Sequence, residues 1–169
     1  LLSSPGLLML DEPFSALDEF LRWNLELELA DVLKEFEGPT LFVSHSRDEI
    51  YRICDNVCVM KDGHGSKVMP VRTLFEKPGT RAAAYLSGCK NFSGIRVTGP
   101  DHVFAEDWNV QLFKEGAGSG RYTDIGVRSH FIRPVDGKEA DGGENIISCR
   151  IHRVIEDVFG MIVMVTPDG

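Results

Sequence analysis

The chain has 169 residues, 43% of them hydrophobic, which is enough for one ordinary domain or two small ones with a buried core. Its formal net charge of −8 argues against nucleic acid as a main partner, because phosphate binding needs a basic surface. No apolar run approaches the roughly 20 residues of a membrane span, and no secretory signal pattern opens the sequence. The sequence has no initiator Met and begins inside an apolar segment, so we expect a fragment.

An apolar run followed by two carboxylates stands near the start. Residues 7–10, Leu-Leu-Met-Leu, predict a strand buried on both faces, as in a parallel sheet. Asp11 and Glu12 follow at its C-terminal end, where open α/β sheets place their chemistry. An Asp there can hold a Mg²⁺ that bridges nucleotide phosphates, and an adjacent Glu can orient or deprotonate water. The alternative is a core strand that ends in a solvated acidic turn.

An amphipathic helix is expected next. Ser15 with an acid three residues later, Asp18, is typical of a helix N-cap, and Gly38-Pro39 predicts the end of the helix. Apolar residues spaced three and four apart mark one face: Leu17, Leu21, Leu25, Leu29, Val32, Leu33 and Phe36. Polar residues mark the other face: Arg22, Glu26, Asp31, Lys34 and Glu35.

Strands and helices then alternate. Residues 40–44 predict a strand that ends at His45, residues 47–54 a helix, and residues 56–61 a strand before an Asp-Gly turn. This order is typical of parallel βαβ units. Two short helices, at residues 71–76 and 80–86, complete a region that we expect to end at residue 88.

The composition changes beyond residue 94, to short β-rich runs separated by Gly, Asp and Pro. The predicted strands cover residues 95–98, 102–105, 110–113, 124–127, 146–155 and 159–166, and the predicted flexible loops cover 115–120 and 136–144. Short strands without long helices predict a small barrel or sandwich. We therefore expect an α/β domain over residues 1–88 and a small all-β barrel or sandwich over 89–169, cut short at its end.

The four cysteines are few and irregularly spaced: Cys54, Cys58, Cys89 and Cys149. Their spacing does not match a zinc site, and three of them stand in or beside apolar runs. We expect reduced, mostly buried thiols.

Three motifs together resemble the nucleotide-binding subunit of ATP-binding-cassette (ABC) importers. Residues 7–18, LLMLDEPFSALD, are similar to the Walker B strand and D-loop of that family, and residues 40–45, TLFVSH, are similar to its H-loop. The run DNVCVMKDG at residues 55–63 agrees as well. The resemblance implies the C-terminal part of a P-loop NTPase sheet with its helices.

The resemblance also implies roles for five residues. Asp11 would help to hold Mg²⁺, Glu12 would be the general base, and His45 would lie beside the γ-phosphate of ATP. Ser15 and Asp18 would belong to the D-loop, which crosses to a second ATPase subunit. The plainer alternatives are an ordinary loop for His45 and a first-turn helix acid for Asp18.

Two motifs of the family are missing. The phosphate loop G-x-x-x-x-G-K-[ST] and the Leu-Ser-Gly-Gly-Gln signature appear nowhere in the sequence. In the family both precede Walker B, so we expect this fragment alone neither to bind ATP tightly nor to hydrolyse it.

The β-rich part resembles the transport-associated oligonucleotide/oligosaccharide-binding-like (TOBE) domain of importer ATPases for molybdate, sulfate, sugars, iron and polyamines. This resemblance implies a small all-β, OB-like barrel over residues 89–169. Residues 124–134, DIGVRSHFIRP, residues 90–92 and residues 145–165 carry this likeness, although Ser129-His130 replaces the usual Pro-Glu. The lead-in at residues 89–91 looks closest to molybdate or sulfate importers. Three further residues, Arg128, His130 and Arg133, suit a tetrahedral oxyanion, and the alternative is that they are surface residues.

The leading interpretation is therefore an importer ATPase fragment with a regulatory β domain. The implied partners are a second ATPase subunit and membrane permease subunits, and the implied location is the cytoplasm, on the inner face of the membrane. The alternative is a non-catalytic module for oxyanion sensing or dimerisation. A DNA-repair or chromosome-maintenance ATPase shares the Leu-Asp-Glu-Pro and His pattern, but it should carry coiled-coil heptads and a basic surface, which this sequence lacks.

Overall fold

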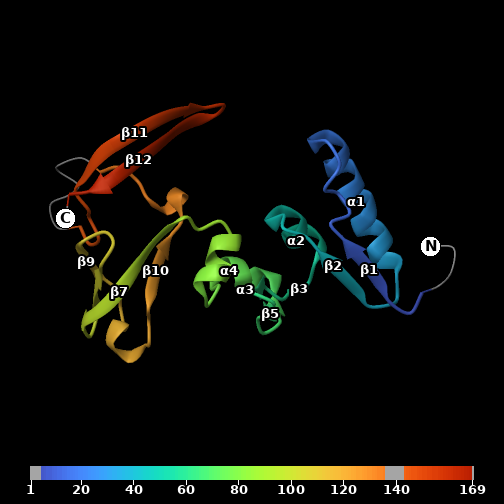
Figure 1. The fold of residues 1–169 in the computed structure, drawn as a ribbon, viewed down its shortest axis with the longest axis horizontal. Coiled ribbons are helices and arrows are strands. Elements are labelled where there is room, and N and C mark those ends of the chain that lie inside the picture. Colours follow the sequence, from blue (N-terminus) through green and yellow to red (C-terminus); the bar gives the residue numbers. More distant parts are fainter. Residues whose placement is uncertain (1–4, 136–142, 169) are drawn as a thin grey trace. The chain divides into compact units, whose positions relative to one another are not determined.

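The computed structural model describes residues 5–135 and 143–168, which belong to two compact units, Leu1–Gly88 and Cys89–Gly169 (Figure 1). The first unit mixes helices with short strands, and the second is built mainly of antiparallel strands. Within the described ranges, no helix is both long and apolar enough to cross a membrane.

The first unit begins with two parallel strands. β1 (Leu8–Asp11) pairs with β2 (Thr40–Val43), and the register sets Asp11 opposite Val43. The expected burial of the first strand on both faces is wrong, since Met9 is 65% exposed. In the described part of the chain this sheet has two strands, which is too narrow for helices to cover both faces.

Helix α1 (Glu19–Glu35) starts later than the sequence predicted. Its N-cap is Asp18, whose Oδ1 accepts a hydrogen bond from the Leu21 amide at 2.9 Å. Ser15 instead lies in the preceding turn, where its amide donates to the Glu12 carbonyl at 3.1 Å. The helix also ends at Glu35, before Gly38-Pro39.

The predicted division of this helix into an apolar buried face and a polar exposed face is wrong, as one of its ion pairs shows. Glu26, assigned to the polar face, is 3% exposed because its Oε2 accepts from Nε of Arg52 at 2.9 Å. Arg52 belongs to α2 (Arg47–Ile53) and also lies over the Trp23 ring, 4.9 Å from its centroid. Leu21 and Val32 of the predicted apolar face stay exposed, since α1 meets α2 through Glu26.

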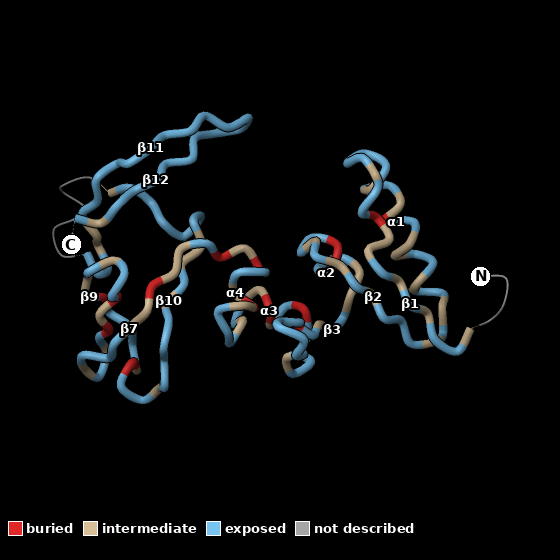
Figure 2. The backbone as a smooth tube through the Cα atoms, viewed as in Figure 1, coloured by how far each residue is buried: buried red, intermediate tan, exposed pale blue. Residues whose placement is uncertain are grey.

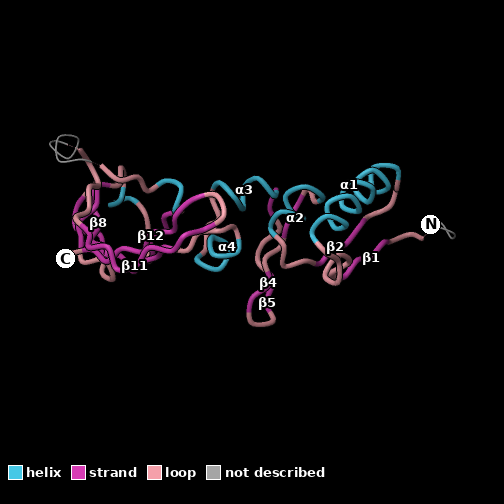
Figure 3. The backbone as a smooth tube through the Cα atoms, turned by 90° about the horizontal axis from the view of Figure 1, so that it is seen from above, coloured by secondary structure: helices cyan, strands magenta, loops and turns pink. Residues whose placement is uncertain are grey.

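Short strands and two helices complete the first unit. The predicted strand over residues 56–61 is divided into β3 (Asn56–Val57) and β4 (Met60–Lys61), because the Val59 amide and carbonyl bond to Ser66 between them. β3 pairs with β6 (Met69–Pro70). β4 and β5 (His64–Gly65) form the hairpin that projects in Figure 3.

The Asp-Gly turn of that hairpin is confirmed. Asp62 and Gly63 both have positive φ, as a tight two-residue hairpin turn requires. Helices α3 (Val71–Glu76) and α4 (Arg81–Leu86) follow close to the predicted positions. The core of this region consists of buried residues and the partly buried ones against them: Val59, Leu74 and Ala83, with Val57, Met69 and Phe75.

The second unit contains a four-stranded antiparallel sheet with the strand order β10-β7-β8-β9. Its strands are β7 (Asn91–Gly99), β8 (His102–Ala105), β9 (Val110–Phe113) and β10 (Asp124–Val127). A short 3₁₀ turn, η1 (Ala117–Ser119), lies between β9 and β10, and a second, η2 (Ser129–Phe131), follows β10. The buried residues shown in red in Figure 2 include the core of this sheet: Val103, Ala105, Leu112 and Ala117.

A separate hairpin takes the place of the expected closed barrel. β11 (Cys149–Asp157) and β12 (Gly160–Pro167) pair with each other, and in the described residues neither pairs with the four-stranded sheet. Every residue of β11 is exposed. The structure therefore shows an open sheet and a hairpin, and most of the predicted loop at 136–144 lies outside the described residues.

The cysteines are less buried than expected. All four are free thiols, and of these only Cys89 is buried. Cys149 is exposed because it lies on the uncovered hairpin. Burial, followed by the nearby Asp55 carboxylate, raises the pKa of the partly buried Cys54 thiol.

Candidate functional site

The C-terminal ends of the two parallel strands bring the predicted catalytic residues to one edge of the sheet. Glu12 directly follows β1, and its amide donates a hydrogen bond to the Val43 carbonyl at the end of β2, at 2.8 Å. His45 lies two residues beyond Val43. The parallel register thus places positions 12 and 45 side by side.

Glu12 and His45 contact each other through two hydrogen bonds to one oxygen. The His45 amide donates to Glu12 Oε1 at 3.0 Å, and Nδ1 of the same residue lies 2.8 Å from that atom. An ionised carboxylate can only accept, so Nδ1 carries a proton and Nε2 is left for another partner. The Glu12 side chain is 33% exposed and that of His45 is 80% exposed, so water can reach both.

The backbone at Glu12 is unusual. Its φ is +45°, in the left-handed region that a non-glycine residue adopts only at a cost of about 1–3 kcal/mol. The conformation is fixed on both sides, because the Glu12 amide bonds to Val43 and its carbonyl accepts from the Ser15 amide. The residue in this conformation is the one whose carboxylate contacts His45.

Asp11 lies at the end of β1 with an exposed side chain. Within residues 5–135 and 143–168, no group of three or more His, Cys, Asp or Glu side chains could hold a metal ion. Mg²⁺ is usually bound by one or two carboxylates together with phosphate oxygens and water, so a single exposed Asp fits such an ion.

The turn that leaves this edge contains the other two predicted residues. Ser15 is exposed in the turn, while the Asp18 carboxylate caps α1. A residue that the sequence reasoning did not single out, Phe14, is 5% exposed and packs on Phe42 of β2, with ring centroids 6.3 Å apart. This aromatic contact holds the turn onto the strand pair.

Three polar residues around His45 were also missed. Ser44, Ser46 and Glu49 form a chain of hydrogen bonds at the start of α2. The pattern Ser-x-x-Glu at residues 46–49 is a capping-box signature and could have indicated Ser46 and Glu49, whereas Ser44 lies outside the pattern.

The predicted oxyanion residues cluster in sequence around η2. Arg128 is half-buried at its start, whereas His130 and Arg133 are exposed. The His130 ring contacts the ring of Phe131, with centroids 4.3 Å apart. Two hollows lie in the described part of this unit, and none of the three residues lines either of them, so a shared anion site stays a prediction.

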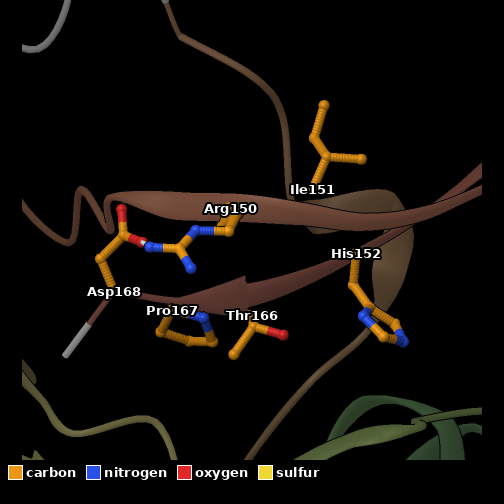
Figure 4. Close-up of a pocket in the computed structure, with 6 residues that line it drawn as sticks. All are labelled: Arg150, Ile151, His152, Thr166, Pro167 and Asp168. Carbon is orange, nitrogen blue, oxygen red and sulfur yellow. Dashed lines mark ion pairs between the residues drawn. The ribbon is translucent and has the colours of Figure 1, made fainter.

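One of those hollows lies at the base of the hairpin, lined by Arg150, Ile151, His152, Thr166, Pro167 and Asp168 (Figure 4). Arg150 Nη2 is 3.8 Å from Asp168 Oδ1, and the Ser148 hydroxyl donates to the other oxygen of that carboxylate at 3.0 Å. The Arg150 side chain is 85% exposed. Its charge is already paired, so the hollow does not carry a binding assignment.

Curated relatives are found for part of the chain, although no family model matches it. An Fe(3+) ions import ATP-binding protein of Haemophilus influenzae is 36% identical over 85 residues, which is 50% of this chain and 24% of the relative. A spermidine/putrescine import ATP-binding protein of Roseobacter denitrificans is 35% identical over 133 residues, 77% of this chain and 36% of the relative.

A third relative extends the likeness along the chain. A spermidine/putrescine import ATP-binding protein of Rubrobacter xylanophilus is 28% identical over 159 residues, 92% of this chain and 42% of the relative. The chain thus spans between 24% and 42% of the length of these three relatives. Over the matched residues, this chain is similar to the ATP-binding subunits of ABC importers.

Proposed function

We propose that this chain is the C-terminal portion of the ATP-hydrolysing subunit of an ABC importer. The observation that carries the proposal is the Glu12–His45 contact at the carboxyl edge of a parallel strand pair. Similarity to import ATP-binding proteins supports it independently. Leu1–Gly88 would be part of the ATPase domain, and Cys89–Gly169 a TOBE-like regulatory domain.

The geometry supports a division of labour between three side chains. Glu12 Oε1 is occupied by both His45 donors, whereas Oε2 accepts no hydrogen bond from the described residues. Oε2 would therefore orient a water and take its proton, with His45 fixing the carboxylate and presenting Nε2 to the γ-phosphate. Asp11 would hold Mg²⁺, which supplies charge compensation on the ATP phosphates when bound.

The partners and location follow from the same proposal. A second copy of the subunit would complete each ATP site, with Ser15 and Asp18 in the loop facing it, and permease subunits would couple hydrolysis to import. The subunit would work in the cytoplasm, on the inner face of the membrane. The names of the relatives favour Fe(3+) or a polyamine as cargo and give no support to the expected oxyanion.

The test is substitution of Glu12→Gln in the intact subunit. ATP binding should persist, and turnover should fall by a factor of about 10²–10⁴, because the amide cannot take a proton. His45→Ala should also slow hydrolysis strongly. Glu19→Gln, at an exposed acid on the first turn of α1, is the matched control. Wild-type turnover in the Glu12→Gln variant would sink the general-base assignment.

A further inference from the structure

The two residues on either side of His45 are bound to each other through a side chain. The Ser46 amide donates to Ser44 Oγ at 3.0 Å, and the Ser44 hydroxyl donates to Glu49 Oε2 at 2.6 Å. Glu49 is 4% exposed, so this carboxylate is fixed inside the protein. The turn at residues 44–46 is therefore closed, with His45 at its apex.

This arrangement modifies the usual capping box. In a capping box the N-cap Ser bonds the N3 amide, and the N3 Glu accepts directly from the N-cap amide. Here Ser46 Oγ does accept from the Glu49 amide, at 3.4 Å. The Ser46 amide, however, reaches Glu49 through the interposed Ser44 hydroxyl. The helix cap, which usually involves two residues, therefore includes a third, Ser44, which precedes His45 in the sequence.

The carboxylate at the end of this relay belongs to a helix that is itself anchored. Arg52, one turn beyond Glu49 on α2, makes the ion pair with the buried Glu26 of α1 and lies over Trp23. Residues held through packed elements keep their geometry better than residues on free loops. The turn that carries His45 is consequently tied to the body of the first unit.

We propose that Ser44 and Glu49 are positioning residues for His45. They hold the turn so that the amide and Nδ1 of His45 both meet Glu12 Oε1, and their own described hydrogen bonds go to each other and to Ser46 rather than to Glu12. The effect on catalysis rests on the proposed function, but the effect on the His45 geometry does not.

The test measures both effects in the intact protein. With ¹⁵N-labelled histidine, the ring ¹⁵N shifts of His45, detected through its carbon-bound protons and assigned by the loss of this signal in His45→Gln, should report the tautomer with the proton on Nδ1. Ser44→Ala should lower the ratio of the Nδ1–H to the Nε2–H tautomer by roughly five- to tenfold and lower kcat for ATP by a similar factor, with KM changed less than twofold. Ser44→Thr, which keeps the hydroxyl, should restore both.

Further variants separate positioning from folding. Glu49→Gln retains an acceptor oxygen for Ser44 and should stay close to wild type, while Glu49→Ala should match Ser44→Ala. Asp48→Asn alters an exposed acid beside Glu49 and should change neither signal nor rate. An unchanged His45 signal in both alanine variants would overturn the proposal. A changed signal in a protein without ATP turnover would instead refute the proposed function and leave the positioning role standing.

Discussion

The parallel pair β1–β2 and the antiparallel hairpin β11–β12 are both two-stranded sheets, but they differ in how side chains tie them to the segments that follow. The hairpin has an exposed ion pair between Arg150 and Asp168 at its base, whereas the parallel pair has a buried aromatic contact and two hydrogen bonds. Phe14 packs on Phe42, and Glu12 is bonded to His45, beyond the end of β2. The longer hairpin leaves all of β11 exposed, and Phe159 at its tip is 100% exposed. Backbone pairing fixes the shape of a strand pair, whereas side-chain contacts with other elements fix its position.

The hairpin nevertheless has a patterned surface. Ile151 pairs with Val165 and Val154 pairs with Val163, with a bulge at His152 between them. Because of this bulge, the four side chains lie on the same side of the hairpin. Without the extra residue, Val154 would turn to the face of Arg150. The hairpin therefore has one apolar side that is suited to burial.

The largest expected effect is at the ion pair that anchors α2 in the first unit. Arg52→Ala leaves the buried Glu26 carboxylate without its partner and should lower the free energy of unfolding of this unit by about 3–5 kcal/mol. Denaturant titration followed by Trp23 fluorescence measures it, with Trp108, the other tryptophan, replaced by Phe in every variant.

Lys34→Ala is the control for that experiment. Lys34 pairs with Asp31 on the exposed side of α1, and its loss should cost less than about 0.5 kcal/mol. Equal destabilisation by the two variants would show that the Arg52–Glu26 pair stabilises the first unit no more than an exposed surface pair does.

A medium effect should separate the core of the second unit from its hairpin. Leu112→Ala, at a site 5% exposed, should cost about 2–4 kcal/mol, while Val163→Ala, at a site 48% exposed, should stay within about 0.5 kcal/mol. Thermal unfolding with Trp108 as reporter tests the pair. A large loss from Val163→Ala would mean that another part of the protein covers this face of the hairpin.

The smallest effect is expected at the helix cap beside the site. Asp18→Ala removes the acceptor for the Leu21 amide and should lower stability by about 1 kcal/mol, whereas Asp18→Asn should recover most of it. Unfolding midpoints in urea give the comparison. If Asn and Ala behaved alike, the cap would not be what fixes the start of α1.

Local sequence patterns predicted where the strands and helices lie better than they predicted which residues are buried. Apolar runs, β-rich segments and the Asp-Gly turn located most strands and helices of both units, because these signals lie within a few residues. The burial of Glu26 could not be foreseen, since its partner lies 26 residues away and helical periodicity treats every charge as solvated. The open hairpin was missed because alternation predicts a strand and not what covers it.

The candidate site shows the same limit. Strand order was enough to place Glu12 and His45 at one edge, but their contact depends on a left-handed residue and on a serine hydroxyl bonded to a buried carboxylate. Neither feature has a periodic signal. The capping pattern at residues 46–49 indicated a helix start without showing that Ser44 takes part.

The double hydrogen bond from His45 to one oxygen of Glu12 makes this residue a chelating donor. Once either bond has formed, the other closes within the same residue at a high effective concentration, so the two should form and break together. A small shift of the turn would then release the carboxylate completely rather than by degrees. The Glu12–His45 contact would then have two states, with both hydrogen bonds formed or both broken.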